Sequence, residues 1–219
     1  MPHSPAQDGD RALQREVGPA AMTLRCDDAV YPARLRALEM APALLHQRGA
    51  WDERLPALAV VGARAASGAA LRLCHELTQV VVRAGYGVVS GGAIGIDAAA
   101  HRAALGTRGR TCVVLGTGID VVYPQRHGAL FIEILRRGGC LLSSFPAGTP
   151  PKPWHFPARN RLIAALSDAV LVVEAGAQSG SRSTAEAAME LGRPVLCVPG
   201  SAGADALLRE GARPVRSAE

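Results

Sequence analysis

The residues from Val88 to His101 read VVSGGAIGIDAAAH, and this stretch constrains the fold more than any other part of the chain. A β-branched run, a glycine-rich turn and an alanine-rich segment follow one another, which predicts a strand, a tight loop and the start of a helix. Backbone N–H groups of such a loop and of the first helical turn point the same way and attract an anion, most often a phosphate. Gly91, Gly92 and Gly95 permit positive φ angles and let a ligand approach the backbone closely. An ordinary turn of an α/β fold explains the same residues, so both interpretations stay open.

Apolar runs alternate with amphipathic segments along most of the chain. Strands are predicted at residues 58–62, 87–90, 111–116, 140–144, 169–174 and 194–198, with a short one at 214–215. Helices are predicted at residues 68–84, 96–105, 126–137, 160–166, 183–191 and 204–210. Strands that are apolar throughout and alternate with helices form a parallel sheet covered on both faces. We therefore predict a single α/β domain with a doubly wound, mostly parallel, Rossmann-like sheet, whose ligands bind outside the carboxyl ends of the strands.

The chain divides into three predicted segments. Residues 1–19 are polar and mixed in charge, which predicts a disordered tail. Residues 20–54 are expected to form a short helical or looped lead-in that packs on the edge of the main domain, and residues 55–219 the Rossmann-like domain itself. The first residues lack the apolar segment of a signal peptide, and no apolar run reaches the length of a membrane span. We expect a cytoplasmic protein that does not associate with membranes.

The charge balance favours an anionic partner. Lys and Arg number 24 against 19 Asp and Glu, which gives a formal net charge of +5 and a pI of about 9.3. Arginine supplies nearly all the positive charge and is suited to phosphate forks and to stacking on bases. The five cysteines form no CxxC pair, which fits a reduced cytosol without disulfides.

Several common site types are missing from the sequence. GxxxxGK[ST] does not occur, and Gly116-Thr117-Gly118 lacks the third glycine of GxGxxG, so a P-loop ATPase or an ordinary NAD enzyme is not expected. No Cys/His spacing fits a zinc site. Asp97 and His101 lie four residues apart on one predicted helix, as a base pair or two metal ligands would, although a helix-capping Asp and a structural His are favoured. We predict neither a metal nor a cofactor.

The stretch KPWHFPARNR at residues 152–161 is the most unusual in composition. It holds three cations, one His, two aromatic residues and two prolines within ten residues. Rings that stack on bases and cations that follow the backbone are typical of proteins that bind single-stranded nucleic acid. A long crossover loop anchored in the core by Trp154 and Phe156 explains the same stretch. Arg64 follows the first predicted strand at the ligand edge of the sheet, and residues 178–183 (QSGSRS) form a second candidate phosphate loop before a helix.

The motifs SGGAIGIDAAAH, HFPARNRLIAALS, AVLVVEAGAQSGSRSTAEAAMELGRPVLCVPG and YPARL followed by AVVGAR resemble the DNA-processing protein A (DprA/Smf) family. The resemblance extends from about Tyr31 to Val215 in the family's order. It implies an extended Rossmann fold, single-stranded DNA binding, protection of incoming DNA and loading of the RecA recombinase in natural transformation and recombination. It also implies a homodimer and no catalysis.

The resemblance assigns thirteen residues to a DNA and phosphate pocket. Arg64 resembles the family's arginine after the first strand, and Lys152 and Phe156 resemble its cation and stacking ring. The remaining ten resemble the phosphate-cradling loop, the RNR element and the loop before the next helix, and they are Ser90, Gly91, Gly92, Gly95, Arg159, Asn160, Arg161, Ser179, Gly180 and Ser181.

The chain departs from the family at Glu186, where the family seldom places an acid, and at Gly203-Ala204-Asp205 in place of Gly-x-Asn. From this sequence we also expect little room for an N-terminal sterile-alpha-motif-like domain and none for a C-terminal winged helix. Two alternatives stay open. Residues 179–186 (SGSRSTAE) imitate the spacing of a loop in phosphoribohydrolases of the same fold, where Glu186 would stabilise an oxocarbenium-like centre. A sensor that binds a small nucleotide in the same pocket is the other.

Overall fold

Nine strands form one sheet in the order β1-β2-β6-β5-β4-β3-β7-β8-β9 in the computed structural model, which describes residues 19–217. All but residue 19 of the predicted disordered tail at residues 1–19 thus lies outside the described residues. The strands are β1 (Met22–Arg25), β2 (Leu44–Gly49), β3 (Ala57–Val61), β4 (Gly87–Ser90), β5 (Thr111–Leu115), β6 (Cys140–Ser143), β7 (Ala169–Val172), β8 (Val195–Cys197) and β9 (Arg213–Pro214). The sheet is parallel from β6 to β9. The predicted fold class is confirmed.

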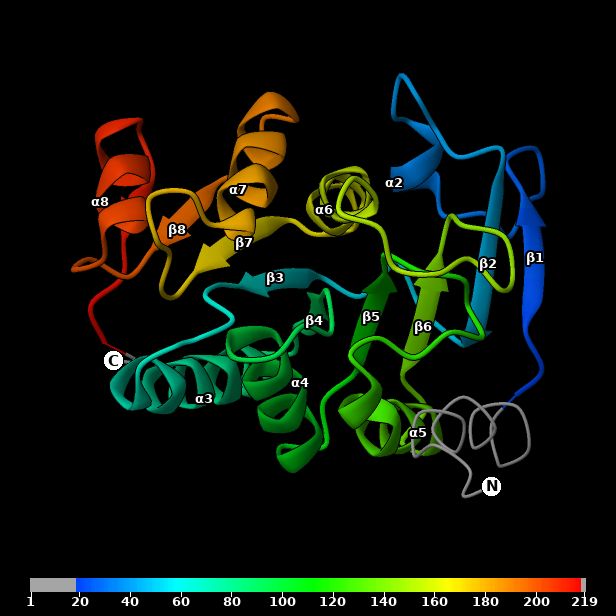
Figure 1. Ribbon diagram of the computed structural model, residues 1–219, viewed down its shortest axis with the longest axis horizontal. Helices are drawn as coiled ribbons and strands as arrows, with labels where there is room; N and C mark the ends of the chain where they lie inside the picture. Colours follow the sequence, from blue (N-terminus) through cyan, green and yellow to red (C-terminus); the bar gives the residue numbers. More distant parts are fainter. Residues whose placement is uncertain (1–18, 218–219) are drawn as a thin grey trace, which may run out of the picture.

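Helices cover both faces of the sheet (Figure 1). One face carries α3 (Gly68–Arg83), α4 (Ile96–Gly106) and α5 (Gly128–Arg136), the last preceded by the short helix η1 (Gln125–His127). The other carries α2 (Ala33–Arg36), α6 (His155–Leu166), α7 (Gly180–Glu190) and α8 (Ala202–Arg209). Every residue of β3, β4, β5 and β6 is buried between these layers, which explains their continuously apolar sequences.

Residues 20–54 do more than pack on the edge of the domain. They contribute β1 and β2, which extend the sheet in antiparallel fashion, so the expectation of helix or loop alone was wrong. Arg34 of α2 forms an ion pair of 2.8 Å with Asp168, whose other carboxylate oxygen accepts the N–H of Ala57 at the start of β3. The boundary expected at residue 55 therefore falls inside one continuous sheet.

The chain reverses its winding direction between β3 and β7. From β3 it proceeds to β4, β5 and β6 on one side and then returns to place β7 on the other side of β3. At such a switch point the loops leave neighbouring strands in opposite directions and open a crevice at the carboxyl ends. The loops after β3, β4 and β7 border this crevice, together with the N-terminal ends of α6 and α7.

Candidate functional site

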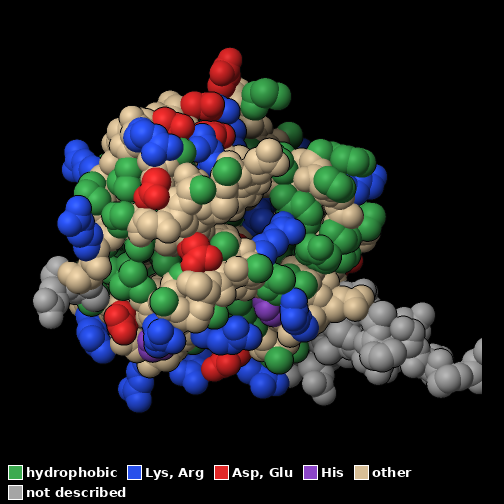
Figure 2. Space-filling model, turned by 60° about the vertical axis from the view of Figure 1, so that its left-hand side comes forward, with side chains coloured by type: hydrophobic (Ala, Val, Ile, Leu, Met, Phe, Trp, Pro, Cys, Tyr) green, Lys and Arg blue, Asp and Glu red, His purple; other side chains and the backbone are tan. Residues whose placement is uncertain are grey.

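A cavity of about 670 Å³ lies at this switch point, which we call the switch-point cavity. This volume is within the range of roughly 300–1,000 Å³ that is typical of ligand pockets. Figure 2 looks toward the carboxyl ends of β3 and β7 and shows a hollow with Lys and Arg side chains in and around it. Eight of the thirteen predicted residues line the cavity, namely Arg64, Lys152, Phe156, Arg159, Asn160, Ser179, Gly180 and Ser181.

The ring of Phe156 is the centre of the cavity wall. The guanidinium carbon of Arg64 lies 5.2 Å from the ring centroid and that of Arg159 lies 5.9 Å from it. The ring of Tyr123 lies 5.6 Å away. The ring is only partly buried, so one aromatic side chain with two cations over it is accessible from the cavity. Cation–π contacts of this kind contribute about 0.5–1 kcal/mol each at exposed sites.

Exposed groups on the segment before α6 widen the mouth of the cavity. Lys152 is exposed, and its ammonium group lies 5.5 Å from the ring centroid of Trp154. Trp154 itself is 65% exposed, so it does not anchor this segment in the core as one interpretation of the sequence expected. Its neighbour His155 is buried instead and stacks on Phe145 with ring centroids 4.2 Å apart.

The start of α7 forms the opposite wall. Ser179 caps the helix by accepting the N–H of Ser181, and the two hydroxyl groups lie 2.8 Å apart. Asn160 of α6 donates to the carbonyl oxygen of Gly180 at 3.0 Å and to the hydroxyl of Ser183 at 2.7 Å. These bonds fix the N-terminal end of α7 against α6. The first turn of α7 contributes the positive end of its helix dipole there.

The glycine loop after β4 holds a side chain of the protein itself. The N–H groups of Gly91 and Ala93 both donate to one carboxylate oxygen of Asp97 at 3.2 Å. The guanidinium of Arg159 lies so close to Gly91 that a Cβ atom there would be 1.9 Å from one of its nitrogens. The anion that this loop cradles is thus the Asp97 carboxylate, which corrects the expectation of a bound phosphate at these N–H groups.

Four further predicted residues lie away from the switch-point cavity. Ser90 is buried and donates to the carbonyl oxygen of Val60, and Arg161 pairs with Glu190 of α7. Gly92 and Gly95 both have positive φ angles, as expected. The atoms that approach these two glycines closely, however, belong to the protein itself and not to a ligand. A Cβ at Gly92 would lie 2.7 Å from Val113, and one at Gly95 would lie 2.2 Å from the carbonyl oxygen of Ala63.

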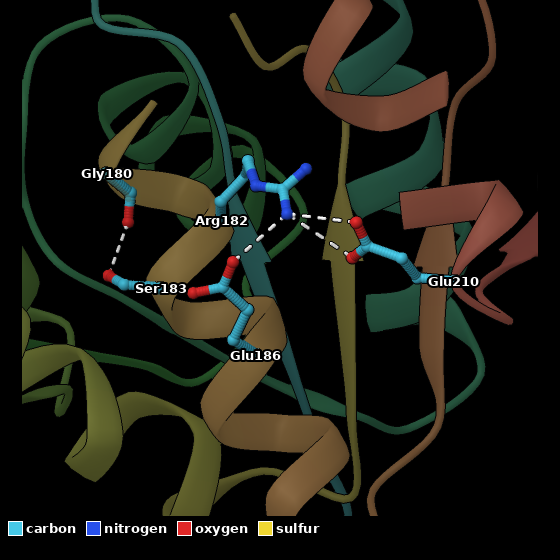
Figure 3. A network of polar contacts seen from close by, with 5 residues as sticks. All are labelled: Gly180, Arg182, Ser183, Glu186 and Glu210. Atoms are coloured by element: carbon cyan, nitrogen blue, oxygen red, sulfur yellow. Dashed lines mark hydrogen bonds and ion pairs between the residues drawn. The ribbon is translucent and has the colours of Figure 1, made fainter. Parts of the chain in front are cut away.

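Glu186 does not point into the cavity. Its carboxylate pairs with Arg182 at 3.2 Å, and Arg182 also binds Glu210 at 3.1 Å, on the side of α7 toward α8 (Figure 3). It is therefore partly neutralised and is not among the residues that line the cavity. This placement removes the geometric basis for an oxocarbenium-stabilising role.

Burial shifts the pKa values of Asp97 and Arg159, which line the cavity, and of His101, one turn further along α4. It raises the pKa of the Asp97 carboxyl, against the opposing effects of Arg159 and of the two N–H groups. It lowers the pKa of Arg159 to about 10, with Asp97 opposing this shift. Burial also lowers the pKa of His101 to about 3, so this histidine is neutral at pH 7. Its Nδ1 lies 2.8 Å from the Thr111 hydroxyl, so Asp97 and His101 serve different partners.

The sequence did not single out Tyr123 or Asp97 as residues that line the cavity. Tyr123 lies in the loop after β5, which is one of the predicted ligand-edge loops, but a lone tyrosine gave no further signal. Within residues 19–217, no cluster of three or more His, Cys, Asp or Glu side chains could hold a metal ion. In the same part of the chain, no helix combines the length and the hydrophobicity that a bilayer-spanning segment requires.

The fold and the site together define a Rossmann-like protein with a cationic, aromatic cavity at the carboxyl edge of its sheet. The family model for DNA recombination-mediator protein A matches residues 22–219, and the chain belongs to this family. Among curated relatives, Protein Smf of Synechocystis sp. is 42% identical over 180 residues, which are 80% of this chain and 45% of that protein. The chain spans about half the length of the first curated relatives that it matches.

Solved structures agree in fold. The X-ray structure of DNA processing protein A from Streptococcus pneumoniae has a TM-score of 0.83 and 39% identity, covering 95% of this chain and 74% of that one. DNA processing protein A from Helicobacter pylori, whose structure concerns a single-stranded DNA binding mode, has a TM-score of 0.82 and 28% identity. That match covers 91% of this chain and 93% of the other.

Proposed function

We propose that this chain binds single-stranded DNA in the switch-point cavity and acts as a binding protein without catalysis. The observation that carries the proposal is the Phe156 ring with Arg64 and Arg159 over it, next to the exposed Lys152. An aromatic face with adjacent cations matches the way in which proteins bind single strands, by base stacking and backbone neutralisation. The single-stranded DNA binding of the Helicobacter pylori relative supports the same assignment.

The physiological role rests on family membership. We propose that the protein works in the cytoplasm, protects incoming single strands and delivers them to the RecA recombinase during natural transformation and recombination, as a homodimer. In this role the cavity needs affinity without base specificity. Stacking and phosphate contacts provide such binding because every base has a π face and every nucleotide a phosphate.

A titration with fluorescent oligothymidine at several salt concentrations tests DNA binding. Arg64→Ala and Lys152→Ala should each weaken binding and reduce the slope of log affinity against log salt by about 0.7, the value for one phosphate on a single strand. Arg83→Ala is the matched control, because this exposed arginine ends α3 just before β4 begins and so lies at the opposite edge of the sheet. Unchanged affinity in both cavity variants would refute the proposal.

Incubation with adenosine monophosphate separates the alternatives. Release of the base would identify a phosphoribohydrolase, and saturable binding without release would identify a nucleotide sensor. The ion pair between Glu186 and Arg182 disfavours the first outcome. We expect no base release. We also expect that the free nucleotide does not bind tightly enough to displace oligothymidine.

A further inference from the structure

A second, smaller cavity lies behind the Phe156 wall, and we call it the arginine cavity. Its volume is about 150 Å³, and it shares Arg64, Phe156 and Arg159 with the switch-point cavity. Its other sides are formed by the loops after β4 and β5 and by Arg126 in η1. The two cavities are therefore neighbours, and Ala93 and the ring of Tyr123 also line both of them.

The lining of the arginine cavity is unusually cationic. Among the described residues, three arginines line it and no Asp or Glu does. Asp97, by contrast, lines the larger cavity. Arg64 and Arg126 are exposed, whereas Arg159 is only 4% exposed, and the charge of Arg64 contributes to lowering its pKa. Three like charges around a small space favour an anion there.

A buried donor in this lining also lacks a partner. The Nε of Arg159 has no hydrogen-bond acceptor within the described part of the chain, although one terminal nitrogen donates to the carbonyl oxygen of Val114 at 2.6 Å. A buried polar group left without a partner is unfavourable, and a charged one is more so. An anion that accepted from this guanidinium would remove both the unpaired donor and part of the repulsion with Arg64.

The size of the cavity limits what this anion can be. One water needs about 10–15 Å³ of such space, and ligand pockets for whole small molecules start near 300 Å³. A volume of about 150 Å³ thus accommodates a phosphate group but not a complete nucleotide. Arginine forks match phosphate oxygens in geometry as well as in charge.

We propose that the arginine cavity binds the terminal phosphate monoester of a nucleotide whose sugar and base lie in the switch-point cavity. This inference rests on the proposed function and adds a requirement for a strand end to it. A monoester carries close to two negative charges near neutral pH, whereas a backbone phosphodiester carries one, so the three arginines favour the former. The monoester belongs either to the end of a strand or to a free mononucleotide.

The first experiment measures the phosphate site without DNA. Inorganic phosphate is added to the whole chain at constant ionic strength, with chloride as the reference anion, and the melting temperature is recorded. Phosphate should raise the melting temperature of the wild type and of Arg83→Ala but not of Arg126→Ala. Arg126→Lys, which keeps the charge but loses the fork, should show an intermediate shift. Equal responses in all four proteins would overturn the inference, whatever happens to DNA binding.

The second experiment identifies the source of the phosphate. Oligothymidines with a 5′-phosphate, a 3′-phosphate or two hydroxyl ends are compared, with thymidine monophosphate as a competitor. One phosphorylated end should bind about tenfold more tightly than the hydroxyl form, a ratio that corresponds to ~1.4 kcal/mol. Arg126→Ala should abolish this preference. Competition by the mononucleotide without any end preference would assign the site to free nucleotides. The absence of both effects would refute both sources of the phosphate. That result would leave the salt-dependent binding test of the larger cavity unaffected.

Discussion

Phe156→Leu separates base stacking from packing at the cavity wall. Leucine keeps most of the volume that contacts Tyr123 and the backbone at Gly116, so the free energy of unfolding should fall by less than about 1.5 kcal/mol. It removes the π face over which Arg64 lies, and with it any stacked base. Loss of one stacked base costs about 1–3 kcal/mol, so affinity for oligothymidine should fall roughly 5- to 150-fold.

Fluorescence anisotropy with labelled oligothymidine and urea denaturation, both on the same preparations, measure the two effects. The salt slope should not change, because no charge is removed. Phe131→Leu is the matched control: Phe131 is fully buried on α5 and lines neither of the two cavities described above. Its replacement should lower stability and leave the affinity of the folded protein unchanged. If Phe156→Leu instead binds DNA like the wild type, the ring serves packing alone and the stacking argument is wrong.

Three further predictions concern other parts of the structure. Gly95→Ala places a Cβ 2.2 Å from a carbonyl oxygen at φ +79°, so urea denaturation should show a loss of more than about 1 kcal/mol, and folding should suffer at least as much as DNA binding. Because the folded pKa of His101 is about 3 and its ordinary value is 6.5, the unfolded chain binds more protons between these values. His101 should therefore contribute a loss of ~3 kcal/mol of stability from pH 7 to pH 4, and His101→Leu should remove this contribution. In a Trp51→Phe background, bound oligothymidine should quench the emission of the exposed Trp154; unchanged emission at saturation would exclude a contact.

The central strands were predictable because burial on both faces leaves a continuous apolar signal. Residues 111–116 were predicted as a strand and residues 111–115 form β5, all of them buried. The strand β2 carried no such signal. Its sequence LLHQRG alternates between exposed and buried positions near the sheet edge, and three of its six residues are polar or charged. Its strand character comes from antiparallel pairing with β6, a contact that is distant in the sequence.

The start of α6 was misjudged for a local reason. The prolines at residues 153 and 157 favoured a loop up to residue 159, whereas the helix begins at His155. Pro157 is the third residue of α6, within the first turn, where backbone N–H groups have no partner inside the helix and a proline costs little. The earlier start puts Phe156 on the same rigid helix as Asn160 instead of in a loop, which fixes both positions at the cavity.

The sequence predicted which loops meet but not what fills them. The family resemblance assigned Arg64, Lys152 and Phe156 to one pocket at the carboxyl edge of the sheet, and the structure brings all three to one cavity. The internal pairing of side chains is a different matter. Whether a glycine loop cradles a ligand or a carboxylate from its own helix depends on side-chain positions to within an ångström, and no spacing pattern encodes that.

In the proposed function, the glycine loop after β4 supports DNA binding indirectly. Its N–H groups hold the Asp97 carboxylate, and the lack of a side chain at Gly91 makes room for the guanidinium of Arg159. Arg159 in turn lies over Phe156, so the loop sets the position of the stacking ring from behind. Asp97 offsets part of the charge of Arg159 from within the protein, and the Nε of Arg159 has no hydrogen-bond partner among residues 19–217. In the proposed function, a strand contacts the exposed Arg64 and Lys152, and the neighbouring arginine cavity takes the phosphate at the end of that strand.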